Sequence, residues 1–72
     1  MATHPDDIKQ QVGAMIREAR IRKGLTLKEL GLQLGVSESV AARYEQGKQN
    51  LTIETLQKLA TALGFKFEAR FV

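Results

Sequence analysis

The fold of this chain is decided by residues 26–48, which read TLKELGLQLGVSESVAARYEQGK. Two short helices that cross closely need a small residue where they touch and a glycine where the chain reverses. Gly31 and Gly35 meet these two needs, and Val36 follows as an apolar residue inside the turn. The stretch therefore predicts two short helices joined by a tight turn.

Polar caps mark where these two helices begin and end. Thr26 and Glu29 have the spacing of a capping box, so we expect the earlier helix to start there and to end at Gly35. Ser37 is suited to cap the later helix, which we expect from about Glu38 to Gln46. The inward positions of the two helices are predicted to be Leu27, Leu30, Leu34, Val40, Ala41 and Tyr44.

Amphipathic segments lie on both sides of this stretch, and each is predicted to form one more helix. The preceding helix runs from about Asp6 to Lys23, and Gly24 ends it. The following helix is capped by Thr52 and ends at Gly64. Their apolar positions, expected in the core, are Ile8, Val12, Met15, Ile16 and Ala19 in the preceding helix and Ile53, Leu56, Leu59, Ala60 and Leu63 in the following one.

The last eight residues change from a helical to a two-residue repeat, which predicts a half-buried β-strand. A lone strand leaves its backbone donors and acceptors unpaired, and the rest of the sequence is predicted to be helical. We therefore expect residues 65–72 to pair with the same residues of a second copy across a two-fold axis. The residues of this dimerisation strand that face the partner are predicted to be Phe65, Phe67, Ala69 and Phe71.

Length and composition limit the architecture to a single domain. We divide the 72 residues into a flexible tail (1–7), a helical domain (8–64) and a dimerisation strand (65–72). A domain of this size buries only about 60% of the surface of its unfolded chain and needs further stabilisation. The chain has no cysteine and one histidine, so disulfides are excluded, a structural zinc site has almost no ligands available, and we expect no metal or other cofactor. Oligomerisation is therefore the remaining source of further stabilisation.

The charge distribution is compatible with binding to nucleic acid. The net charge is +3, and six Lys or Arg residues but only one acid lie between Lys9 and Lys28, so one end of the molecule is expected to be basic. No apolar run approaches the roughly 18 residues of a membrane span, and no secretion signal precedes the first helix. The sequence thus favours a soluble, cytoplasmic protein that does not bind membranes.

Residues 26–48 resemble the helix-turn-helix of the Cro and phage-repressor, or Xre-type, family, and the segments before and after them are similar to its flanking helices. The resemblance implies an all-α, four-helix, lambda-repressor-like DNA-binding domain that binds operator DNA as a dimer, with the third helix in the major groove. It also implies a buried ion pair between Arg20 and Glu45, which we interpret as structural.

The chemistry of recognition assigns roles to the exposed positions around the third helix. Arg43 is the strongest candidate for reading bases, because a guanidinium group can bond O6 and N7 of guanine together. Lys28, Lys48 and Gln49 flank the helix and are expected to contact phosphates, which sets register without reading sequence. The complete set of predicted DNA-contacting residues is Lys28, Ser37, Glu38, Ser39, Ala42, Arg43, Gln46, Lys48 and Gln49.

Three residues depart from the family pattern. Leu27 replaces a glutamine that commonly touches phosphate, and Glu38 places a carboxylate where many relatives have a polar or basic residue. Ala41 replaces a larger aliphatic residue, so we expect Tyr44 or a phenylalanine to fill the space. The first two departures indicate an unusual operator or a modest affinity.

The predicted function is a sequence-specific transcriptional regulator, a repressor that binds an inverted-repeat operator as a homodimer. The C-terminal segment is also similar to the strand of short antitoxins of the HigA and HipB kind, which leaves open a second role in binding a toxin through the N-terminal tail and first helix. A helical protein-interaction module that never meets DNA is a further alternative. Enzymatic function is disfavoured because the chain lacks cysteine and its one histidine, His4, lies in the tail.

Overall fold

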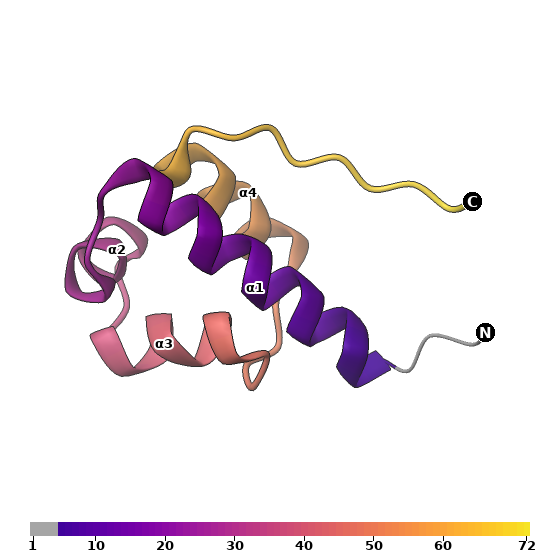
Figure 1. Cartoon of the computed structure of the whole chain (residues 1–72), viewed down its shortest axis with the longest axis horizontal. Coiled ribbons are helices and arrows are strands. Elements are labelled where there is room, and N and C mark those ends of the chain that lie inside the picture. Colours follow the sequence, from indigo (N-terminus) through magenta and orange to yellow (C-terminus); the bar gives the residue numbers. More distant parts are fainter. Residues whose placement is uncertain (1–4) are drawn as a thin grey trace.

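Four α-helices make up the part of the chain that the computed structural model describes, residues 5–72, with side chains from Ile8 onward (Figure 1). They are α1 (Pro5–Lys23), α2 (Leu27–Leu34), α3 (Glu38–Gln46) and α4 (Ile53–Leu63). The predicted four-helix domain is therefore confirmed, with α1 starting one residue earlier than expected. Residues 5–7, predicted as part of the flexible tail, belong to α1 instead. Residues 1–4 lie outside the described residues, and their flexibility stays a prediction.

Hydrogen bonds from side chains fix the start of each short helix. The Thr26 hydroxyl oxygen accepts from the Glu29 amide at 3.0 Å, and the Thr26 amide donates to the Glu29 carboxylate at 2.8 Å. Ser37 accepts from the amide of Val40 at 3.1 Å, and Thr52 caps α4 in the same way. These contacts satisfy amides that a helix start leaves without partners. The bond that the Thr26 amide donates to the Glu29 carboxylate is the main cause that lowers the pKa of Glu29, and the Thr26 side chain lowers it further.

The turn between α2 and α3 depends on two glycines with different roles. Gly31 is buried, and a Cβ atom there would lie 2.8 Å from the carbonyl oxygen of Val36, closer than real Cβ atoms approach. Gly35 ends α2 with a φ of +73°, a left-handed conformation that costs glycine little. The expected requirement for a small residue and a reversing glycine is met at these positions.

Another close approach, at Gly13 in α1, was not anticipated from the sequence. A Cβ atom at Gly13 would lie 2.5 Å from the carbonyl oxygen of Glu45 and 2.8 Å from that of Tyr44. The last turn of α3 thus packs directly against the backbone of α1. Gly13 sets how closely these two helices approach.

All four helices contribute to one apolar core. Its buried members are Ile16, Leu30, Ala41, Tyr44, Leu59 and Leu63. Ala41 is fully buried, and of the side chains expected to compensate for its small size, Tyr44 is 7% exposed whereas the phenylalanines are exposed. Burial of Leu30, Ala41 and Tyr44 fixes the inner faces of α2 and α3 and leaves their opposite faces outside the core.

Three residues expected in the core are exposed, so that part of the prediction is wrong. Met15 is 64% exposed, because it points roughly 100° around α1 from its buried neighbour Ile16. Ile53 is 72% exposed, since it lies roughly 80° around α4 from the buried Leu63. Ile8 is half exposed, and Figure 1 shows that the N-terminal turns of α1 extend beyond the other helices.

Residues 65–72 continue from α4 as extended chain and form no strand in this single molecule (Figure 1). The amide of Phe65 bonds the carbonyl oxygen of Ala60 at 2.8 Å, which completes the end of α4. Beyond that point Phe71 and Val72 are fully exposed. A strand needs a second backbone to pair with, so the dimerisation strand remains a prediction.

Candidate nucleic-acid interface

One side of α3 is packed inside the protein and the other is exposed. Helix α3 contacts α1 and α2, and it lies at the lower edge of the bundle in Figure 1. The predicted DNA-contacting residues of this region are exposed apart from Ala42 and Gln49, which are partly buried. The exposed ones are Lys28, Ser37, Glu38, Ser39, Arg43, Gln46 and Lys48. The structure thus brings these positions to one side of α3 and its flanks, while their contact with DNA stays a prediction.

Arg43 is held against the loop that follows α3. Its Nε donates to Oε1 of Gln49 at 3.1 Å, and its Nη2 donates to the carbonyl oxygen of Lys48 at 3.1 Å. Both bonds use one edge of the planar guanidinium group, which leaves the Nη1 and Nη2 hydrogens of its outer edge for another acceptor pair. Arg43 is therefore oriented before any ligand arrives, and less rotamer entropy is lost on binding.

Sequence reasoning missed this coupling between Arg43 and Gln49. The sequence feature that allows this contact is Gly47, whose φ of +71° turns the chain back at the end of α3. Since Oε1 of Gln49 accepts from Arg43, the amide NH₂ group of Gln49 is the part left to contact an outside acceptor such as a phosphate oxygen. Arg43 and Gln49 form one unit rather than two independent contacts.

The helix N-termini beside this unit provide further donors. Ser37 is occupied as an acceptor by the Val40 amide, so its hydroxyl hydrogen remains to donate outward. Lys28 lies in the first turn of α2 and Ser39 in the first turn of α3, both exposed. Backbone amides and the positive end of a helix dipole favour phosphate at such places.

An ion pair braces α3 from its inner side. Arg20 donates through Nε to Oε2 of Glu45 at 2.5 Å and through Nη2 to Oε1 at 3.2 Å, and its Nη1 donates to the carbonyl oxygen of Leu25 at 2.9 Å. The two side chains are 14% and 7% exposed. The hydrogen bond with Glu45 raises the pKa of Arg20, although burial opposes this. The pair ties α1 and the turn after it to α3.

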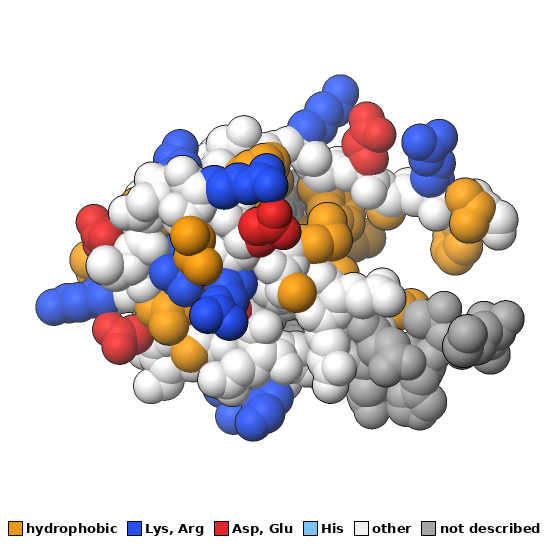
Figure 2. All heavy atoms as spheres, viewed as in Figure 1, with side chains coloured by type: hydrophobic (Ala, Val, Ile, Leu, Met, Phe, Trp, Pro, Cys, Tyr) orange, Lys and Arg blue, Asp and Glu red, His pale blue; other side chains and the backbone are white. Residues whose placement is uncertain are grey.

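The surface is less uniformly basic than the sequence suggested. Arg20 is neutralised by Glu45, and Arg22 pairs with Glu18 at 2.8 Å. Figure 2 shows Lys and Arg side chains interspersed with Asp and Glu on the face that it presents. The positions around α3, rather than an overall basic patch, therefore identify the candidate interface.

The structure explains two of the departures from the family pattern. Leu27 is partly buried and packs against the core, which replaces a polar contact with an apolar one. Glu38 is exposed in the first turn of α3, where the helix dipole favours a carboxylate. Among residues 8–72 no cation pairs with Glu38, so it is available to accept from a cytosine amine.

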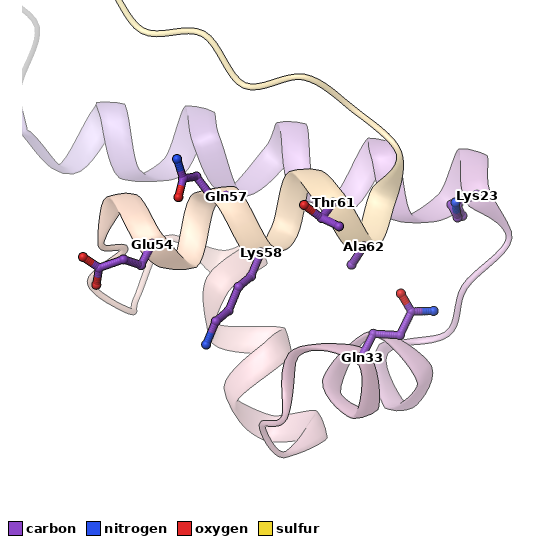
Figure 3. A pocket seen from close by; sticks show the side chains of 7 residues that line it. All are labelled: Lys23, Gln33, Glu54, Gln57, Lys58, Thr61 and Ala62. Atoms are coloured by element: carbon purple, nitrogen blue, oxygen red, sulfur yellow. The ribbon is translucent and has the colours of Figure 1, made fainter.

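A shallow hollow between α2 and α4 does not resemble a small-molecule site (Figure 3). It is lined by Lys23, Gln33, Glu54, Gln57, Lys58, Thr61 and Ala62 and lies open to solvent, whereas small-molecule pockets enclose most of their ligand. Within the part of the chain that the structure describes, no group of three or more metal-ligating side chains is present. No helix in that part is long and apolar enough to span a membrane.

These features define a helix-turn-helix domain: two short helices joined at Gly31 and Gly35, with the later one exposed along one side. A helix-turn-helix family model matches residues 16–69. The chain belongs to this family of DNA-binding proteins involved in transcription regulation, which confirms the resemblance identified in the sequence.

Two protein relatives illustrate the similarity. An uncharacterized HTH-type transcriptional regulator, y4dJ, of Sinorhizobium fredii is 38% identical over 58 residues, which cover 81% of this chain and 75% of the relative. Human endothelial differentiation-related factor 1 is 33% identical over 67 residues. This match covers 93% of the chain but only 45% of the human protein, so the chain spans less than half the length of that relative.

Solved structures of regulators have the same fold. The restriction-modification controller protein C.AhdI from Aeromonas hydrophila matches with a TM-score of 0.80 and 31% identity, over 88% of this chain and 93% of that one. The clp gene regulator ClgR from Corynebacterium glutamicum matches with a TM-score of 0.77 and 33% identity, over 81% of this chain and 62% of that one.

Proposed function

We propose that this protein is a transcriptional repressor that binds an inverted-repeat operator as a homodimer, with α3 in the major groove. The observation that carries the proposal is the preorganised Arg43, whose outer guanidinium edge is free of the contacts that hold it to Lys48 and Gln49. A bidentate contact from arginine to guanine discriminates against other bases by about 1 to 3 kcal/mol. Such a contact supplies sequence specificity.

The surrounding residues account for positioning on the duplex. Lys28, Ser37, Lys48 and Gln49 donate to phosphates on either side of the groove, while Ser39, Ala42 and Gln46 approach the bases beside Arg43. The ion pair of Arg20 and Glu45 holds the helix from behind. A rigid helix presented in this way keeps its register on the DNA.

A homodimer supplies the symmetry of the operator. Two copies of α3 that enter successive major grooves lie about 34 Å apart, one turn of the duplex, so the recognised sequence is an inverted repeat. A chain of 72 residues without cysteine also gains stability from association. In this proposal the protein acts in the cytoplasm, and residues 65–72 join the two copies.

The similarity to known regulators supports this proposal at the level of the class. C.AhdI is a restriction-modification controller and ClgR a clp gene regulator, and both share the fold over most of this chain. The antitoxin role remains an alternative prediction, which a toxin that copurifies with this chain would support. A module that binds only protein is the other alternative, and salt-dependent duplex binding distinguishes it.

Selection of bound duplexes from a random pool tests the proposal. We expect wild type to enrich an inverted repeat, and Arg43→Ala to lose preference at one base position in each half-site. Arg22→Ala is the matched control, because it removes the same charge from an exposed arginine of α1. If Arg43→Ala weakened binding to all duplexes alike, Arg43 would be a phosphate contact rather than a base contact. The absence of any enriched sequence with wild type would contradict the proposed function.

A further inference from the structure

We propose that residues 65–72 pair with those of a second copy in one antiparallel register, centred on Ala69. The inference rests on the proposed homodimer and specifies what that proposal leaves open, namely which residues face one another across the two-fold axis. Each position of such a ribbon lies opposite a position equally far on the other side of Ala69. Residues 66 to 72 then all have partners.

The extended segment already separates an apolar face from a charged face. Phe65 and Phe67 are 47% and 40% exposed, whereas the side chains of Lys66 and Glu68 are 87% and 68% exposed. Phe71 has no cover at all. After the Phe65 amide, which bonds Ala60, no further backbone bond to the rest of residues 5–64 is formed by this segment. An extended chain of this kind presents a free edge for another strand.

Like charges argue against a register centred on Glu68. In that arrangement Glu68 faces its own copy, and Lys66 faces Arg70 on both sides of the axis. Directly opposed like charges destabilise a sheet. Three unfavourable charge pairs would thus lie on a ribbon of only seven or so residues.

A register centred on Ala69 replaces these repulsions with attractive pairs. Glu68 faces Arg70 twice, and Phe67 faces Phe71 twice, so that both the charged and the apolar face have matched partners. Opposite charges and paired aromatic rings directly across a sheet are each stabilising. The small side chain of Ala69 at the axis leaves room for the four phenylalanine rings beside it.

A register centred on Phe67 pairs opposite charges but leaves apolar side chains without a partner. Lys66 then faces Glu68, yet Phe71 and Val72 are opposite residues 63 and 62, which belong to α4 and have no free backbone to offer. Phe71, the most exposed of the phenylalanines, would stay in water. The Ala69 register covers it and is the one favoured by both charge and burial.

Single-cysteine crosslinking tests the register, because the natural chain has no cysteine. In the proposed ribbon the two copies of position 69 are adjacent, those of position 68 are offset by roughly 7 Å along the strands, and those of position 67 by roughly 13 Å. Disulfides require Cα atoms closer than about 7 Å, so Ala69→Cys should form covalent dimer at least about tenfold faster than Phe67→Cys or Glu68→Cys under mild oxidation. Gln33→Cys, exposed on α2, gives the rate of chance collisions.

Charge exchange gives a second readout that does not alter the aromatic residues. Glu68→Arg and Arg70→Glu should each weaken the dimer in sedimentation, and the double variant should restore it. Lys66→Glu should have little effect in this register, although it would disrupt the register centred on Phe67.

The outcomes separate this inference from the proposed function. Fastest crosslinking of Phe67→Cys or Glu68→Cys overturns the Ala69 register, and rates equal to that of Gln33→Cys for all three variants overturn the ribbon itself. Binding of wild type to the selected duplex is measured independently and tests DNA recognition whether or not the ribbon exists.

Discussion

Replacing Glu45 by glutamine removes one charge from an ion pair that is almost hidden from water. The side chains of Arg20 and Glu45 expose 14% and 7% of their surface, and both carboxylate oxygens accept from the guanidinium group. Arg20 stays charged in the variant, because no protein environment of this kind deprotonates arginine. The substitution therefore leaves a charge without its partner between α1 and α3.

The expected cost is about 3 kcal/mol, the lower end of the range for breaking a buried pair, since Arg20 retains some contact with water. A chain of this length has a total stability of roughly 4 to 11 kcal/mol. The variant thus loses a quarter or more of its stability. The melting temperature should fall by about 12 to 24 °C, given about 4 to 8 °C per kcal/mol for domains of this size.

Urea unfolding followed by circular dichroism measures this cost, at several protein concentrations to account for association. Glu18→Gln is the matched control, since it breaks the exposed pair with Arg22 and should cost less than about 1 kcal/mol. Replacing both partners, with Arg20→Met and Glu45→Leu, should recover much of the loss. A Glu45→Gln variant as stable as Glu18→Gln would show that the buried pair contributes no more than the exposed one.

Three further predictions concern the turn, a helix cap and the flank of α3. Gly31→Ala should destabilise the domain by about 1 to 3 kcal/mol in thermal unfolding, because the new Cβ atom would lie 2.8 Å from the Val36 carbonyl oxygen. An unchanged melting temperature would contradict this close contact. Because the pKa of Glu29 is lowered in the folded state, its carboxylate contributes to stability above its unfolded pKa of about 4.3, and this contribution is lost as the pH falls through the folded pKa. Glu29→Gln should therefore reduce the loss of stability at acid pH. Stability that falls equally with pH in the variant and the wild type would contradict this prediction. Lys48→Ala should weaken binding to all duplexes alike and lower the salt slope by about 1, whereas a change in sequence preference would argue for a base contact.

Local signals in the sequence were sufficient to predict the helices. Thr26 and Ser37 cap α2 and α3 through their own hydroxyl groups, and Gly35 reverses the chain through its own φ, so each acts over a few residues. Such short-range interactions do not depend on how distant segments pack. The bounds of α2 and α3 were predicted well for this reason.

The contacts between helices were harder to predict. Spacing placed Met15 on an apolar stripe of α1, but a stripe does not reveal which part of it a neighbouring helix covers, and Met15 is 64% exposed. The need for Gly13 arises only where α3 meets the backbone of α1. The bonds from Arg43 to Gln49 and Lys48 likewise depend on the path of the loop after Gly47.

The C-terminal segment shows a different limit. Alternation of phenylalanine with charged residues predicts a strand, but a strand forms only when a second backbone satisfies its donors and acceptors. Within residues 5–72 no such backbone is available, because the remainder forms helices and their connecting turns. The sequence therefore shows that this segment can form a strand, and pairing with a second backbone decides whether the strand forms.

Contact between the exposed side of α3 and DNA can be observed by titrating isotopically labelled protein with the selected duplex in an NMR experiment. The largest shifts should fall on the amides of Ser37 and Ser39 and on the side chains of Arg43 and Gln49, with little change along the exposed side of α4. Shifts concentrated on α4 around Lys58, with α3 unaffected, would contradict this contact.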